Sequence, residues 1–124
     1  MLDGQPRRVA GDKLSAARLR VRLVTSPELD VVVAEGEVDA ATSVGLARVL
    51  QRLVIDRDGD GLVDLRKVRF MDSTGARQLI DASRRLNRNS RSFSVICAPG
   101  AVHRILEKLG LIETLNVVCS KQDR

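Results

Sequence analysis

Residues 61–75 read GLVDLRKVRFMDSTG, and this stretch decides the fold class. Residues 61–65 are short and apolar and follow a turn-rich Asp/Gly cluster, which predicts a central strand. Residues 66–71 are expected to lead out of the sheet. Asp72 and Ser73 are of the residue types that cap the N-terminus of a helix. Apolar residues follow them at three- and four-residue spacings to about Asn89. The stretch therefore predicts a buried strand that passes directly into an amphipathic helix.

A hairpin is predicted before this stretch. Residues 18–25 alternate between apolar and arginine side chains, which is typical of a half-buried edge strand whose inner face holds Leu19, Val21 and Leu23. Residues 26–28, Ser-Pro-Glu, break that strand. Residues 29–34 form a nearly continuous β-branched run, which indicates a strand covered on both sides.

Strands and helices continue to alternate along the rest of the chain. Residues 42–55 predict an amphipathic helix, whose inner face is expected to hold Val44, Ala47, Leu50, Leu53 and Val54. A strand is predicted at 94–97, and a last strand at 115–118. Between them, Pro99-Gly100 begins a third helix that Gly110 ends, with a buried stripe of Val102, Ile105, Leu106 and Leu109.

This order of elements predicts a single α/β domain. Strands joined by helices imply right-handed crossovers, hence a mostly parallel sheet of four to five strands with an antiparallel N-terminal hairpin strand. Three to four helices are expected, on one main face. The length of 124 residues allows one domain. The predicted organisation is a basic, flexible leader over 1–17, the domain over 18–119 and a tail over 120–124.

Composition and charge exclude several classes of function. The chain has two Phe and no Trp or Tyr, which removes the usual platforms for stacking nucleic-acid bases. The net charge is +5, but most of it lies in residues 1–22, so it does not favour a nucleic-acid partner. No apolar stretch has the length of a signal peptide or a membrane span, so a cytoplasmic protein with no membrane partner is expected.

Two sequence patterns suggest a metal site or a catalytic site, but each lacks residues that such a site requires. Residues 56–61 match the opening of a calcium loop, but Lys67 stands where a glutamate must close the coordination shell. Cys97 and His103 are close in sequence, but no orienting carboxylate or Gly-rich oxyanion loop accompanies them. These residues therefore predict no metal site and no catalytic Cys–His pair.

Two other groups of residues leave alternatives open. Cys97 and Cys119 each end a predicted strand; they are either buried free thiols or, if the strands are neighbours, a redox-sensitive pair. Basic residues also line the outer side of the helix after residue 72 and its exit. They form either a solvated face or a docking surface for an acidic partner, and they are Arg77, Arg84, Arg85, Arg88 and Arg91.

The segment Phe70-Met71-Asp72-Ser73-Thr74-Gly75 is the most informative motif. Asp and Ser are preferred N-caps, so the segment is explained by helix capping alone. The same geometry would stabilise a phosphate on Ser73, because helix N-termini present N–H donors and a positive dipole end. The physical chemistry of the segment does not choose between these interpretations.

The wider pattern resembles the STAS domain of bacterial anti-sigma factor antagonists over roughly residues 18–119. The resemblance is carried by Gly36-Glu37-Val38-Asp39 with Thr42, by Val63-Asp64-Leu65, by residues 70–75, and by Val102-x-x-Ile105-Leu106 with Leu109-Gly110-Leu111. It implies that the chain is a regulatory binding protein with no catalytic residues and not an enzyme, and that it needs no cofactor because the ATP belongs to the partner.

The resemblance also implies a switch at Ser73. In this family the serine after the aspartate is phosphorylated by the partner anti-sigma factor, an ATP-dependent serine kinase. The unphosphorylated antagonist binds that kinase and frees the sigma factor, and a serine phosphatase resets the phosphorylated form. Asp39 and Asp72 would flank Ser73, Thr42 would shape the adjacent loop, and the rest of the surroundings would be Thr74, Gly75 and Arg77.

Three alternatives remain at this point: a STAS scaffold that is never phosphorylated, a redox-regulated interaction module, and a basic domain associated with nucleic acid.

Overall fold

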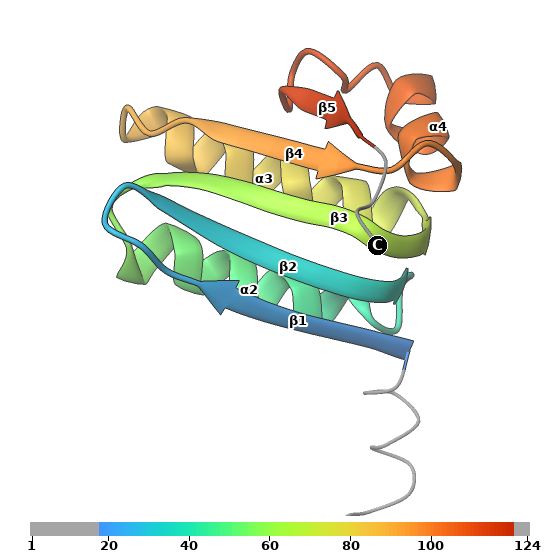
Figure 1. The fold of residues 1–124 in the computed structure, drawn as a ribbon, viewed down its shortest axis with the longest axis horizontal. Helices are drawn as coiled ribbons and strands as arrows, with labels where there is room; N and C mark the ends of the chain where they lie inside the picture. Colours follow the sequence, from blue (N-terminus) through green and yellow to red (C-terminus); the bar gives the residue numbers. More distant parts are fainter. Residues whose placement is uncertain (1–17, 121–124) are drawn as a thin grey trace, which may run out of the picture.

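The computed structural model describes residues 18–120, which form one mixed sheet and three helices (Figure 1). The elements in chain order are β1 (Leu19–Val24), β2 (Leu29–Val38), α2 (Ser43–Asp56), β3 (Asp60–Met71), α3 (Ser73–Arg88), β4 (Phe93–Cys97), α4 (Ala101–Lys108) and β5 (Val117–Cys119). The spatial order of the strands is β1-β2-β3-β4-β5. Strand β1 is antiparallel to β2 and all other pairs are parallel, which confirms the predicted fold class.

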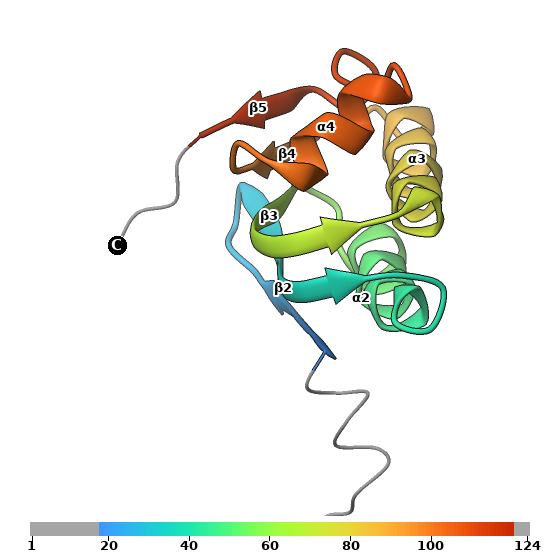
Figure 2. The ribbon, with the colours of Figure 1, turned by 90° about the vertical axis from the view of Figure 1, so that its right-hand side faces the viewer.

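Helices α2 and α3 cover one face of the sheet, and α4 lies where β4 ends (Figure 2). The core between these layers is mostly aliphatic, and Phe93 is its one aromatic residue among those described. No helix of the described chain covers the other face of the sheet (Figure 1). The prediction that residues 29–34 are covered on both sides is therefore wrong, because only every second residue of β2 is buried. The β-branched run indicated a strand correctly but overstated its cover.

Strand β3 differs most from expectation. Residues 66–71 do not lead out of the sheet but stay paired with β2 up to the partners Val38 and Met71. Two register shifts each place one extra residue in β3, so that buried positions change from every second residue to every third. These are β-bulges, which bend a strand without ending it. A reading based on strict alternation misses them.

Smaller corrections concern helix faces and strand ends. Val44 is 54% exposed where burial was expected, because the buried stripe of α2 runs through Leu46 instead. Leu109 is 44% exposed because α4 ends one residue before it.

The last strand is Val117–Cys119, and the buried Leu115 lies in the preceding turn. Gly36 to Val38, which lie beyond the strand predicted over 29–34, belong to β2.

Arg91 is also misplaced by the sequence prediction, which set it on the exposed arginine stripe. It is only 8% exposed, and its guanidinium donates to the carbonyls of Leu53 at 2.8 Å, Val54 at 3.0 Å and Gly59 at 2.7 Å. The last carbonyls of a helix have no partner within that helix. Arg91 supplies donors for the end of α2 and ties it to the start of β3.

We expect Arg91→Ala to lower the free energy of unfolding by about 2–4 kcal/mol, because it leaves buried carbonyls without donors. Arg88→Ala is the matched control, since Arg88 is an exposed arginine of α3, and should change stability by no more than about 0.5 kcal/mol. Urea denaturation of both variants checks this. Equal stabilities for the two variants would contradict the bridging role of Arg91.

Candidate functional site

The connections that follow β2, β3 and β4 meet at one edge of the sheet, which faces the viewer in Figure 2. Val38 and Met71 end their strands as register partners, and the Asp72 N–H donates to the Val38 carbonyl at 3.1 Å. The turn that begins at Asp39 and the start of α3 therefore lie side by side. In open α/β sheets, the carboxyl ends of the strands are where binding sites form.

Asp72 caps α3 and at the same time accepts a hydrogen bond from the side chain of Thr74. Its Oδ1 accepts the Thr74 N–H at 2.9 Å and also the Thr74 hydroxyl. These hydrogen bonds hold the pKa of the Asp72 carboxyl below its ordinary value, although partial desolvation opposes the shift. The Thr74 hydroxyl is half-buried and already has a partner.

Ser73 has the opposite environment. It is the first residue of α3, it is exposed, and its hydroxyl makes no hydrogen bond within residues 18–120. The positive end of the helix dipole lies at this residue. Of the two adjacent hydroxyls, the structure leaves that of Ser73 accessible.

Gly75 explains why the first turn of α3 sits so close to the sheet. A Cβ at this position would lie 2.7 Å from Val38 Cγ1 and 2.9 Å from Met71 Cγ. Any side chain would push the helix away from the strand ends. Gly75 thus sets the height at which Ser73 stands above the edge of the sheet.

Asp39 and Thr42 form a closed hydrogen-bonded turn beside Ser73. Asp39 Oδ1 accepts the N–H groups of Ala41 and Thr42, each at 3.0 Å. The Thr42 hydroxyl accepts the Asp39 N–H at 3.0 Å and lies 2.9 Å from the Glu37 carbonyl. The other carboxylate oxygen of Asp39 pairs with Arg18, which sequence reasoning did not assign to the site. Thr42 is therefore in a position to shape this loop.

Two exposed apolar side chains near this edge were not assigned to the site from the sequence. Val44 lies in the first turn of α2, and Phe70, which is 46% exposed, lies at the end of β3. Phe70 faces outward because of the second bulge, which alternation does not reveal. Arg77 is exposed one turn after Ser73 on the same side of α3. Exposed apolar residues beside a charge suit a protein-binding surface.

The cysteines are neighbours. Cys97 and Cys119 are register partners in parallel strands, and both are free thiols, Cys97 buried and Cys119 exposed. Burial, and to a lesser extent the adjacent Cys119, raises the pKa of the Cys97 thiol to about 11. His103 is half-buried on α4. Among residues 18–120, no group of three or more His, Cys, Asp or Glu could hold a metal ion.

In the same part of the chain, no helix has both the length and the apolar character required to cross a membrane.

We expect Asp72→Ala to lower the free energy of unfolding by about 1 kcal/mol at neutral pH, through loss of the cap. Because folding lowers the pKa of Asp72, its contribution is present above the ordinary value of 3.8 and disappears as the pH falls through the folded value. The stability gap between wild type and variant should therefore narrow below pH 3.8. A gap that stays constant on acidification would contradict this account.

Comparison with known proteins identifies the family. Anti-sigma-B factor antagonists of Staphylococcus aureus and Staphylococcus epidermidis are 28% and 26% identical over 99 residues, which are 80% of this chain and 92% of each relative. A crystal structure of an anti-sigma factor antagonist from Mycobacterium paratuberculosis superposes with a TM-score of 0.74 at 24% identity, covering 80% of this chain and 84% of that one.

The unphosphorylated form of the anti-sigma factor antagonist SpoIIAA superposes with a TM-score of 0.70 at 15% identity, covering 83% of this chain and 90% of that one. These two likenesses concern the fold. The sequence model of the STAS domain matches residues 20–123. The chain belongs to the STAS domain family.

Proposed function

We propose that this chain is an anti-sigma factor antagonist whose binding is switched off by phosphorylation of Ser73. The observation that carries the proposal is the exposed Ser73 hydroxyl at the N-terminus of α3, without a hydrogen bond, next to a Thr74 hydroxyl that Asp72 already engages. The names of the staphylococcal relatives, and a SpoIIAA structure described as unphosphorylated, support this assignment.

The partner in this proposal is an anti-sigma factor with serine kinase activity. The Ser73 oxygen attacks the γ-phosphorus of the ATP bound by that partner, the bond to the β-phosphate oxygen breaks, and ADP and the hydroxyl proton leave. The chain itself needs no cofactor and performs no catalysis. A serine phosphatase restores the hydroxyl, and the cycle runs in the cytoplasm.

The fold tolerates the phosphorylated serine. A phosphate adds about −1.5 to −2 charges at neutral pH, and a helix N-terminus stabilises such a charge. Arg77, one turn later on α3, lies within the spacing at which helical side chains interact. Phosphorylation is thus expected to alter the surface and leave the core unchanged.

The same charge disfavours the complex. Val44 and Phe70 offer exposed apolar surface at this edge. In this proposal the partner covers them together with Ser73. A buried phosphate without matched cations is strongly unfavourable. The carboxylates of Asp39 and Asp72 add like charge on neighbouring loops. The unphosphorylated form therefore binds and the phosphorylated form dissociates.

Incubation with ATP and the cognate anti-sigma kinase should add one phosphate to Ser73, because its hydroxyl is the accessible one. Peptide mass spectrometry locates the phosphate. Ser73→Ala should abolish the modification, whereas Ser92→Ala, which removes an exposed serine at the other end of the sheet, should not. Phosphate on Thr74 would contradict the proposal, and no phosphate would favour a scaffold that is never phosphorylated.

Ser73→Ala should keep the affinity for the anti-sigma factor even after incubation with ATP. The variant lacks the hydroxyl that would accept the phosphate, and it retains the Asp72 cap. Ser73→Asp should weaken binding by about tenfold or more, which corresponds to about 1.4 kcal/mol. Calorimetry measures both affinities, and circular dichroism controls for folding. Unchanged affinity of Ser73→Asp would exclude this edge as the interface.

We also propose redox regulation at the cysteine pair, because Cys97 and Cys119 are register partners. Neighbouring strands lie about 4.8 Å apart, within the range of Cα separations that a disulfide spans. Hydrogen peroxide would oxidise the exposed Cys119 to a sulfenic acid, and the Cys97 sulfur would displace water from it. The two thiols and one peroxide become one disulfide and two waters.

We expect peroxide treatment to remove both free thiols and form an intramolecular bridge, because the register already holds the sulfurs together. Thiol counting, mass spectrometry and non-reducing gels check this, and Cys119→Ser is the control that cannot form the bridge. The bridge would stiffen the sheet just before α4 and alter partner affinity. Two surviving thiols, or a disulfide-linked dimer only, would contradict the switch.

A further inference from the structure

The bulged half of β3 places an unusual number of cations outside the core. Its buried positions are Leu65, Val68 and Met71, three residues apart. A regular strand leaves one of every two residues outside the core, whereas this spacing leaves two of every three. The extra positions hold Arg66 with Lys67, and Arg69 with the exposed Phe70.

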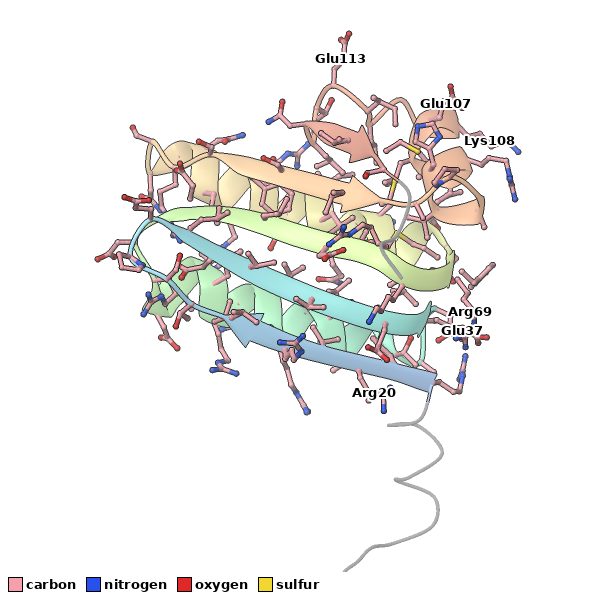
Figure 3. The ribbon with its side chains drawn as sticks, viewed as in Figure 1. Arg20, Glu37, Arg69, Glu107, Lys108 and Glu113 are labelled. Carbon is pink, nitrogen blue, oxygen red and sulfur yellow. The ribbon has the colours of Figure 1, made fainter. Side chains whose placement is uncertain are left out.

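Arg66, Lys67 and Arg69 line a pocket of about 350 Å³ formed by β1, β2 and β3. The pocket is lined by Arg20, Glu35, Gly36, Arg66, Lys67, Val68 and Arg69, which include four cations and one carboxylate. The volume falls within the range of small-molecule sites, about 300–1,000 Å³. Figure 3 shows Arg20 on β1 and Arg69 beside Glu37 at the end of the sheet.

Gly36 contributes only backbone to the β2 side of the pocket, next to the Glu35 side chain. Its φ is +123°, and a Cβ here would lie 2.0 Å from the Arg18 carbonyl oxygen. Only glycine fits this close approach of β1 and β2. The β2 side of the pocket is therefore the Gly36 backbone with the Glu35 side chain, and the basic side chains come from β1 and β3.

Carboxylates balance only part of this charge. Arg20 pairs with Glu35, Arg66 pairs with Asp64 at 2.9 Å, and Arg69 approaches Glu37 at 3.7 Å. The Lys67 ammonium makes no ion pair or hydrogen bond within the described residues. A hydrogen bond from Arg20, together with the charges of Arg20, Lys67 and Arg22, holds the pKa of Glu35 below its ordinary value.

We propose that this pocket binds a small molecule that carries two or more phosphate groups. Guanidinium groups bind phosphate through two parallel N–H donors, and the Lys67 ammonium adds a point charge. A multivalent anion engages several of these groups at once, which a single carboxylate cannot do. This site is separate from the proposed switch at Ser73, and binding there requires neither phosphorylation of Ser73 nor an anti-sigma factor.

Calorimetry with inorganic tripolyphosphate tests the site on the full unphosphorylated chain at about 150 mM salt, where surface charges are screened beyond about 8 Å. The double variant Lys67→Gln/Arg69→Gln should weaken binding by about tenfold or more, since it removes two of the four cations. Arg84→Gln/Arg88→Gln makes the same change of charge on the exposed side of α3 and should leave the affinity within about twofold.

Glu35→Gln gives a change of opposite sign, because it releases Arg20 and removes the one carboxylate of the lining. It should bind tripolyphosphate more tightly than wild type, a result that misfolding does not produce. Absence of binding to wild type would overturn the proposal. Equal weakening by both double variants would show general attraction to a basic chain, which would also overturn it.

Ser73→Asp separates this site from the proposed phosphosite. It should leave tripolyphosphate affinity unchanged, because Ser73 does not line the pocket. A large loss would move the anion to the N-terminus of α3 and overturn the assignment. Phosphorylation assays on Ser73 are independent of all these measurements, so either proposal can fail alone.

Discussion

The parallel pairing of β2 with β3, maintained to the partners Val38 and Met71, is the constraint on which the site depends. It brings the ends of two strands, 33 positions apart in sequence, to one edge of the sheet. The hydrogen bond from the Asp72 N–H to the Val38 carbonyl closes that edge, and Gly75 lets α3 pack directly against it. A shift of either strand by one residue would separate Asp39 from Ser73 and turn the core residues of β3 outward.

Stability and the proposed switch use the same groups at this edge. Asp72 stabilises the start of α3 and holds the Thr74 hydroxyl, which leaves the exposed Ser73 hydroxyl as the accessible one of the two. Asp39 likewise completes its own turn with Thr42 and pairs with Arg18. Because these carboxylates are held by local hydrogen bonds, a charge added at Ser73 meets a rigid surface. The expected effect of phosphorylation is therefore electrostatic, without a rearrangement of the core.

Basic residues have different roles on the two faces of the sheet. On the covered face, Arg91 satisfies carbonyls of α2 and of the loop before β3, so a basic residue contributes to the core through hydrogen bonds. On the uncovered face, the bulges of β3 collect basic side chains around a pocket. The same residue type therefore acts structurally on one side and presents charge to solvent on the other. Its neighbours in space decide between these roles.

The sequence by itself determined the order of strands and helices, the parallel α/β class and Ser73 at the start of a helix, because periodicity and capping depend on residues within about one or two turns. Only the tertiary structure decided the bulges of β3, the burial of Arg91 and the exposure of Val44 and Phe70. It also decided that Cys97 and Cys119 lie next to each other on neighbouring strands. Each of these depends on a register or a contact between segments distant in sequence. Arg91, for example, meets acceptors 32 to 38 residues away, and no local pattern encodes which carbonyls will lack donors there.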